Sequence, residues 1–354
     1  MLTTATGALL AAALSVSVLS VTPTPRRLAS VQDSRITESS GLVASPTHPG
    51  LVWTVNDSGS AATVYGVWLA TGRTLAVLRL ADTRSRDVQA RDMEAMTATR
   101  GPDGRGLLWI GDVGDNRGVR ESVVLRLVNE PRTVGSASLT PVSLRVRYPD
   151  GPHDVETMIW TPDGRLLLVS KLLFGAVIYQ VPARAVAAAL AGRSTSTPVV
   201  AVPVAGVEQS LVTDGAALPD ERIVLRGYEG ATIYPDPPVK AMAGGQLRAL
   251  QQVVLPAQPQ GETLAVVDDG AAVVVGSEGV RQPLWRVALP AAARPTPASS
   301  TAPSSTSDST PAGTSPAVSP PRQGRPGEVP WPVTGALLLA ALAAAAAIAR
   351  RRRR

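Results

Sequence analysis

Short apolar runs rich in Val, Leu and Ile, bounded by Gly, Pro and Asp, recur between residues 26 and 290 and predict β-strands. One short pattern introduces these runs five times: an acidic residue, a few small or apolar residues, and then a strand. The copies are TESSGLVAS at Glu38, RDMEAMTAT at Glu94, HDVETMIWT at Glu156, VTDGAALPD at Asp214 and QGETLAVVD at Glu262. Their starts lie roughly 50 to 60 residues apart, a period that indicates a repeat architecture.

Each of the first four repeats contains enough apolar runs for one antiparallel sheet. In the first repeat the runs span residues 41–45, 51–55, 63–69 and 74–80. Such sheets, repeated radially, make a β-propeller in which each sheet is one blade. We therefore predict an all-β propeller of about five four-stranded blades. The alternatives are six blades, or a β-sandwich with accidental spacing.

The fifth repeat has only three clear strands, at residues 263–267, 271–276 and 283–289. We expect residues 26–31, just before the first repeat, to supply its missing outer strand. That pairing closes the ring and removes a free sheet edge. An Ala-rich stretch at 184–191 predicts a helical insert in the third repeat.

The two ends of the chain lie outside the repeats. Residues 1–25 contain an apolar stretch and a Pro-rich exit, which predict a secretory signal peptide or an N-terminal apolar segment. Residues 291–330 are rich in Pro, Ser, Thr and Ala and have few large apolar residues. Such a segment buries too little surface to offset its ordering entropy, so we expect a disordered stalk.

Residues 331–354 contain WPVTG, an Ala/Leu run and a terminal arginine cluster. This order resembles the LPxTG sorting signal of sortase substrates: Pro332, Thr334 and Gly335 match, and Trp331 replaces the leucine. The apolar run predicts a transmembrane helix, and the arginines place its C-terminal end in the cytoplasm. We therefore expect the propeller on the extracellular face of the membrane or in the cell wall, with the membrane and a sortase as partners.

Composition excludes several classes of function. The formal charge of +6 depends on the five terminal arginines; without them, 29 cationic residues remain against 28 acidic ones. We find no basic patch interleaved with aromatic residues, so we expect no nucleic-acid partner. The chain has no cysteine, which excludes disulfides, thiol catalysis and cysteine zinc sites.

The repeated acids are the first candidates for chemistry. The first strand of each blade starts beside an acid, and the second strand runs back antiparallel, so polar residues from both meet at one mouth of the central channel. Many oxygen ligands suit a hard cation such as Ca²⁺. The candidate metal ligands are Glu38, Asp57, Glu94, Asp112, Glu156 and Glu262. A structural role, in which the carboxylates accept backbone N–H groups, is the alternative.

Positions that break the repeat are candidates for ligand binding. Lys171 and Arg226 stand where other repeats carry acids, and the loop after Asp112 is unusually polar. The candidate ligand-binding residues are Lys171, Arg226, Asp115, Asn116, Arg117 and Glu278. The candidate catalytic residues are Glu94, Asp112, Glu156 and His153. No G-x-S-x-G elbow, Walker loop or HExxH motif is present.

Four paired motifs carry a family resemblance: ESSGL with LVWTVNDSG, DMEAM with LLWIGDVGDN, DVETM with LLLVSK, and GETLA with VVVGSEG. They resemble secreted bacterial propellers labelled phytase-like or esterase-like, over residues 36–290. The resemblance implies Ca²⁺-assisted hydrolysis of phosphate or carboxyl esters. Members more often read D-W-E-D where this chain has Asp92, Met93, Glu94 and Ala95. Three hypotheses follow: a surface-anchored propeller that binds a ligand at the channel mouth, a divalent-ion-dependent hydrolase, or a structural cell-surface module.

Overall fold

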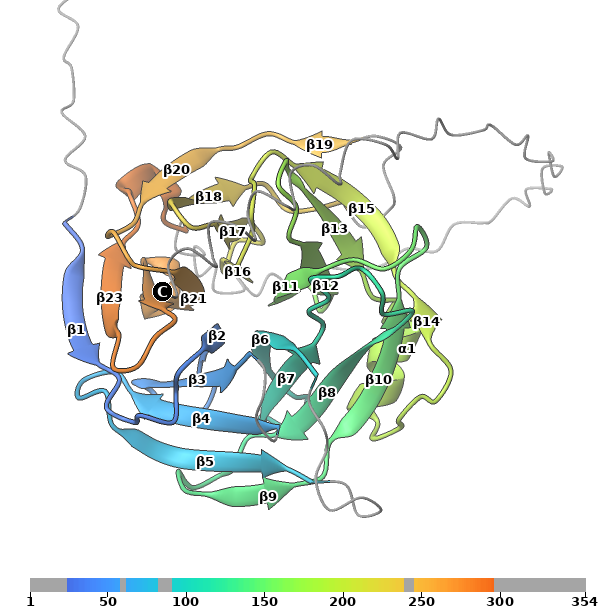
Figure 1. The fold of residues 1–354 in the computed structure, drawn as a ribbon, viewed down its shortest axis with the longest axis horizontal. Coiled ribbons are helices and arrows are strands. Elements are labelled where there is room, and N and C mark those ends of the chain that lie inside the picture. The colour runs from blue at the N-terminus through green and yellow to red at the C-terminus, as the bar shows by residue number, and fades with distance from the viewer. Residues whose placement is uncertain (1–23, 58–61, 82–90, 239–244, 296–354) are drawn as a thin grey trace, which may run out of the picture. The chain divides into compact units, whose positions relative to one another are not determined.

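A computed structural model describes residues 24–57, 62–81, 91–238 and 245–295. They form five sheets around a central axis, so the predicted all-β, five-bladed propeller is confirmed (Figure 1). Most of the segment 1–25, most of the predicted stalk 291–330 and all of the predicted anchor 331–354 lie outside the described residues. Pro332, Thr334 and Gly335 are among the residues outside.

In the first four blades the main strands run in chain order from an innermost strand at the axis to an outer strand. The first blade contains β2 (Ser39–Ala44), β3 (Leu51–Asn56), β4 (Thr63–Trp68) and β5 (Thr74–Leu80). The second contains β6 (Met93–Arg100), β7 (Gly106–Asp112), β8 (Val123–Asn129) and β10 (Val142–Arg147). The third contains β11 (Val155–Trp160), β12 (Leu166–Ser170), β13 (Ala176–Gln180) and β15 (Val202–Val207). The fourth contains β16 (Asp214–Ala217), β17 (Ile223–Arg226), β18 (Gly230–Tyr234) and β20 (Gln251–Val254).

The fifth blade is completed by the N-terminal strand. It contains β21 (Gly261–Val267), β22 (Ala272–Ser277) and β23 (Pro283–Ala288), and β1 (Arg26–Ser30) pairs antiparallel with β23. The predicted closure by residues 26–31 is therefore confirmed. The backbone N–H of Val31 also donates to the carbonyl of Gln282 at 3.0 Å. Without β1, β23 would be a free edge.

Three short strands extend the sheets beyond the expected four strands. They are β9 (Ala137–Leu139), β14 (Val199–Val200) and β19 (Gln246–Leu247). Each belongs to the following blade in sequence and pairs in parallel with the outermost strand of the preceding blade. Runs of two or three residues are too short to give a periodic sequence signal, so the sequence did not predict them. They link neighbouring blades at the rim.

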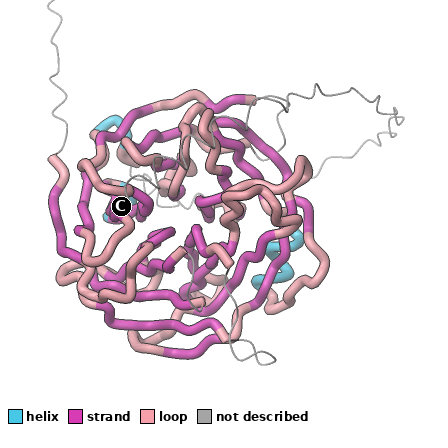
Figure 2. The backbone as a smooth tube through the Cα atoms, viewed as in Figure 1, coloured by secondary structure: helices cyan, strands magenta, loops and turns pink. Residues whose placement is uncertain are grey.

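Helical structure is sparse in the described part of the chain (Figure 2). The predicted insert is the α-helix α1 (Ala183–Leu190), which lies between β13 and β14. Two 3₁₀ turns, η1 (Asp268–Gly270) and η2 (Ala291–Ala293), flank the last two strands of the fifth blade. None of the described helices has both the length and the hydrophobicity to cross a membrane.

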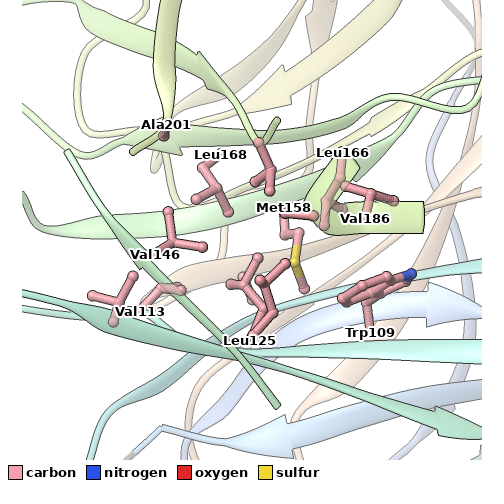
Figure 3. Packing of buried hydrophobic residues seen from close by; sticks show 14 of the residues in the cluster. Trp109, Val113, Leu125, Val146, Met158, Leu166, Leu168, Val186 and Ala201 are labelled. Atoms are coloured by element: carbon pink, nitrogen blue, oxygen red, sulfur yellow. The ribbon is translucent and has the colours of Figure 1, made fainter. Parts of the chain in front are cut away.

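The hydrophobic core consists of five clusters, each between two adjacent blades. Figure 3 shows the cluster between the second and third blades, where Trp109 and Leu125 pack with Met158 and Leu168. Successive residues of a strand face opposite sides of its sheet, so a strand covered on both sides is apolar at nearly every position. The run from Leu166 to Val169, fully buried throughout, has this character.

A buried carboxylate joins three of the innermost strands. Asp214, at the start of β16, accepts the backbone N–H of Leu42 (β2) at 3.0 Å and of Leu264 (β21) at 2.7 Å on Oδ2. Its Oδ1 accepts the N–H of Gly215 at 2.8 Å. The side chain is fully buried. One residue therefore links the first, fourth and fifth blades at the axis, in agreement with the structural alternative for the repeated acids.

Replacing this carboxylate should destabilise the propeller. Asp214→Ala leaves the N–H groups of Leu42 and Leu264 buried without an acceptor, so we expect a loss of about 2 to 4 kcal/mol in the free energy of unfolding. Urea denaturation followed by tryptophan fluorescence measures this loss. The exposed-turn variant Asp103→Ala is the control and should change little. Equal stabilities of the two variants would show that the Asp214 bridge is dispensable.

Candidate functional site

β-Bulges shape the start of the innermost strands. The register with the second strand shifts in four blades, and in three of them the extra residue is a glutamate: Glu94, Glu156 and Glu262. A bulge leaves its extra residue unpaired and redirects the side chain. In the first blade the shift instead falls at Gly41, where a Cβ atom would lie 2.6 Å from the backbone N of Met96.

Backbone hydrogen bonds correct the alignment of the repeated acids. The carbonyl of Glu38 accepts the N–H of Asp57 at 3.0 Å, just as the carbonyl of Asp154 accepts the N–H of Lys171 at 2.9 Å. Glu38 is therefore equivalent to Asp154, two residues before Glu156, rather than to Glu156 itself. Asp214 also differs, because it pairs directly with Arg226 and no bulge precedes it. The five acids of the sequence pattern thus do not form one symmetric ring.

One carboxylate cluster forms between the first and second blades. Asp57 follows β3, Asp92 precedes β6 and Glu94 lies in the β6 bulge; one oxygen of each lies within 4.8 Å of the others. Glu94 Oε2 also accepts the Ser40 hydroxyl at 2.6 Å. A Cβ atom at Gly114 would lie 2.5 Å from Asp92 Oδ2, so a residue without a side chain is needed there.

The close approach of these acids perturbs their ionisation. Burial, a hydrogen bond with Asp57 and the charge of Asp57 raise the pKa of Asp92 to about 7. Burial raises the pKa of Glu94 well above its ordinary value, and the charges of Glu156 and Asp57 raise it further. Near neutral pH, the cluster is therefore stabilised by a bound proton or by a bound cation.

A second group of charges lies on the third and fifth blades. Lys171 Nζ lies 2.5 Å from Glu156 Oε1 and 5.2 Å from the ring centroid of Tyr228. Burial favours the neutral amine, but the charges of Glu156 and Glu262 raise the pKa of Lys171 above its ordinary value. Burial and the charge of Glu262 raise the pKa of Glu278 to about 7. This group, like the first, is crowded with acids.

Asp112 has a structural position. It is 2 % exposed and forms ion pairs with Arg120 at 2.9 Å and Arg126 at 3.0 Å. Its oxygens also accept the backbone N–H groups of Arg91 and Asp92. With its oxygens occupied by these donors, Asp112 holds the segment that carries Asp92, and its metal-binding and catalytic roles stay predictions from the sequence.

Arg226, a predicted ligand-binding residue, is hydrogen-bonded inside the protein. It is fully buried, and its Nη1 donates to the carbonyls of Thr263 at 2.6 Å and Gly276 at 3.0 Å. Its Nη2 donates to Gln258 Oε1 at 2.6 Å. Burial lowers the pKa of Arg226 to about 10. The guanidinium therefore joins the fourth blade to the fifth through Nη1 and Nη2.

The remaining sequence candidates lie in two places. Asp115, Asn116 and Arg117 are in the loop between β7 and β8, and Glu38 directly precedes β2. Asp115 is buried, accepts the N–H of Arg120 and donates its own N–H to Asp154 Oδ1 at 2.8 Å. Asn116 and Arg117 are exposed on the same loop. Glu38 is half-buried, and its charge contributes to the raised pKa of Glu278.

His153 packs into an aromatic cluster. Its ring packs against Tyr148 and Tyr179 at centroid distances of 5.4 Å, and Nε2 lies 3.0 Å from Asp150 Oδ1. The Tyr179 hydroxyl donates to the same carboxylate at 3.0 Å. The structure therefore places His153 in an aromatic cluster, not beside Glu94 or Asp57.

Asp92 is the residue that sequence reasoning missed as a site candidate. Its signal was present, because Asp92 and Glu94 are two residues apart and alternate residues of a strand share a face. Asp154 and Glu156 repeat the same spacing in the third blade. The sequence pattern contains one acid per repeat, so it did not include Asp92 or Asp154.

Comparisons with known proteins leave the function open. No family model and no curated protein matches this chain. Among solved structures, the PQQ-bound aldose sugar dehydrogenase of Streptomyces coelicolor has 13 % identity and a TM-score of 0.40, covering 76 % of this chain and 99 % of that one. A luciferin-regenerating enzyme has 7 % identity and a TM-score of 0.38, covering 77 % of this chain and 94 % of that one. A putative gluconolactonase has 12 % identity and a TM-score of 0.38, covering 78 % of this chain and 96 % of that one. Likenesses this distant do not assign a site.

The raised pKa of Asp92 predicts a specific pH dependence of stability. Between its unfolded pKa of about 3.9 and its folded pKa of about 7, the folded chain holds a proton that the unfolded chain has released. The contribution of Asp92 to the free energy of unfolding therefore falls as pH rises from about 3.9 to about 7. Relative to Asp92→Asn, the wild-type melting temperature should decline from pH 4 to pH 7, measured with a chelator present. If the difference in melting temperature between the wild type and Asp92→Asn stayed constant from pH 4 to pH 7, the raised pKa of Asp92 would be contradicted.

Proposed function

We propose that the channel mouth is a cation-binding site in which Asp57, Asp92 and Glu94 bind a divalent ion. The observation that supports this most directly is the approach of three carboxylate oxygens within 4.8 Å in a partly buried position. Repulsion and desolvation disfavour such a cluster when it is ionised, and a bound cation removes both penalties. The donor set consists of oxygen atoms alone, which suits Ca²⁺ better than softer metals.

The fit of this site to a hard cation rests on the groups around it. Ca²⁺ takes six to eight oxygen ligands in proteins, so three carboxylates would leave positions for water or for ligand oxygens. The Ser40 hydroxyl, which now donates to Glu94, is a further oxygen beside the cluster. When bound, the ion would supply positive charge at the mouth and a coordination point for a ligand.

We favour ligand binding over ester hydrolysis because Lys171 and Arg226, the two cationic residues expected to hold an anionic substrate, already have partners in the protein. Lys171 is paired with Glu156, and Arg226 is buried in hydrogen bonds to carbonyl and amide oxygens. His153, the expected base, lies in an aromatic cluster. We therefore propose a binding module in preference to the phytase-like or esterase-like hydrolase that the sequence resemblance implies.

The proposed location is the extracellular face of the cell membrane or the cell wall. Support comes from the sequence alone: the apolar N-terminal segment, the Pro/Ser/Thr-rich stretch, and the WPVTG motif followed by an apolar run and arginines. Extracellular Ca²⁺-binding modules work with dissociation constants of about 10⁻⁴ to 10⁻³ M, so even a weak site would be occupied there.

Calcium should stabilise the protein through this cluster. Saturating Ca²⁺ should raise the melting temperature by about 3 °C or more, because a ligand that binds only the folded chain shifts the unfolding equilibrium. Asp92→Asn and Glu94→Gln should each abolish most of that shift, whereas the exposed Asp103→Asn should retain it. Differential scanning calorimetry with and without a chelator measures the effect.

Two results would count against this proposal. An unchanged melting temperature in Ca²⁺, Mg²⁺ and Mn²⁺, with no metal found by elemental analysis, would remove the cation site. Metal-dependent hydrolysis of 4-nitrophenyl phosphate or acetate that Glu94→Gln abolishes would restore the hydrolase hypothesis instead.

The location has its own test. Deleting residues 331–354 removes the predicted anchor, so we expect the propeller to move from the cell-envelope fraction to the culture medium. Fractionation with immunoblotting against the propeller measures this, and Thr334→Ala tests cleavage of the WPVTG motif separately. Retention of the truncated chain at wild-type levels would rule out C-terminal anchoring.

A further inference from the structure

Exposed apolar side chains surround the acidic mouth. The turns between the second and third strands of the second to fifth blades reach this face, because the second strand of each blade ends there. These turns carry Val119, Leu173, Phe174, Tyr228 and Val280, with exposed fractions of 62, 45, 90, 38 and 47 %. A phenylalanine with nine-tenths of its surface in water is costly, and exposed apolar groups gathered on one face indicate contact with a partner. We call this set the apolar rim.

The rim lies directly beside the charged groups of the mouth. Leu173 and Phe174 share a turn with Lys171, and Val280 follows Glu278 by two residues. The Tyr228 ring contacts the Lys171 ammonium, as described above. Rim residues and charged residues of the mouth therefore share the same turns.

Acidic side chains outnumber basic ones at the mouth. Its acids in the described part of the chain are Glu38, Asp57, Asp92, Glu94, Asp154, Glu156, Glu262 and Glu278. Lys171 is paired with Glu156, and Arg120 is paired with the buried Asp112. Arg117 and Arg281 are exposed in the rim turns, but neither Glu262 nor Glu278 forms an ion pair in the described chain, so a cationic group would complement these two acids.

Two buried oxygens point independently to a missing donor. Glu262 is 3 % exposed and Glu156 is 2 % exposed, yet no group in the described chain donates a hydrogen bond to Oε2 of either residue. Both residues lie in bulges at the start of innermost strands, and Glu156 Oε1 pairs with Lys171 there. A buried acceptor without a donor costs about 1 to 3 kcal/mol, a penalty that a bound donor removes.

We propose that the mouth and the apolar rim form a docking surface for a protein segment that presents a lysine or arginine between apolar side chains. The basic group enters on the side of the third and fifth blades and donates to Glu262 and Glu278. Its apolar neighbours cover Phe174, Leu173 and Tyr228. Arginine is preferred to lysine, because its planar fork can serve two carboxylates at once. This inference rests on the proposed attraction of cations to the mouth, but Glu262 and Glu278, which would accept the basic group, lie outside the metal cluster.

Binding of a matched peptide pair to the full-length protein tests the proposal. The probes are fluorescein-labelled Ala-Leu-Arg-Leu-Ala, capped at its C-terminus, and the same peptide with glutamine in place of arginine. We expect at least about tenfold tighter binding of the arginine peptide by fluorescence anisotropy at near-physiological salt. Glu278→Gln should reduce this preference to less than about threefold. Phe174→Ser should weaken both peptides by about fivefold and keep the preference.

Control variants separate this proposal from simpler explanations. Leu75 is 41 % exposed on β5, next to Thr74, which pairs with Val67 at the end of β4 opposite the mouth turns, so Leu75→Ser should change nothing. Asp92→Asn should lose the calcium effect but keep peptide binding, so the two proposals can fail separately. Equal affinity for the two peptides, or full binding by Phe174→Ser, would overturn the docking surface. Tight binding of spermidine that Phe174→Ser leaves unchanged would assign the mouth to small cations and also overturn it.

Discussion

Closure of the ring by β1 is the constraint on which the rest of this propeller depends. The first and fifth blades come from opposite ends of the described chain, and they share a hydrophobic cluster that includes Leu42, Val52 and Val274. Pairing of β1 with β23 holds these blades together without a covalent link. The acids of the mouth depend on the same closure, because Glu278 of the fifth blade experiences the charges of Asp57 and Glu38 from the first. A ring opened at this point would separate the site into two halves.

The mouth concentrates like charges where a stable protein alone would not need them. Burial and mutual repulsion raise the pKa of Asp92 and of Glu278 to about 7, far above the ordinary range for carboxyl groups. Other buried acids in the same molecule have firm partners: Asp112 has two arginines, and Asp214 has three backbone N–H groups. Burial nevertheless raises the pKa of Asp214 to about 8, so hydrogen-bond partners rather than the pKa distinguish the acids that support the fold from those of the proposed cation site.

Sequence reasoning located the fold well and the site only in part. Alternating and continuous apolar runs predicted the blades and the N-terminal closing strand, since both reflect local periodicity and the burial of each sheet on two faces. Candidates such as Glu94 and Asp57 were found because carboxylates repeat at strand ends. Arg226 and Asp112 were assigned to ligands because sequence shows where a strand ends but not which side chains a neighbouring blade covers. Their buried partners, such as Thr263 and Arg126, lie on other strands of the fold.

By itself, the sequence determined the repeat, the blade composition and the acidic character of one face, because each depends on residues close together in the chain. The tertiary structure decided which acids meet. Asp57 and Asp92 are brought together only when the first blade packs against the second, and Glu156 and Glu262 only when the ring is complete. Distances across blades follow from packing and bulge geometry, and neither leaves a pattern in the local sequence. The apolar rim was equally hidden, since exposure depends on what lies above a turn rather than on the residues within it.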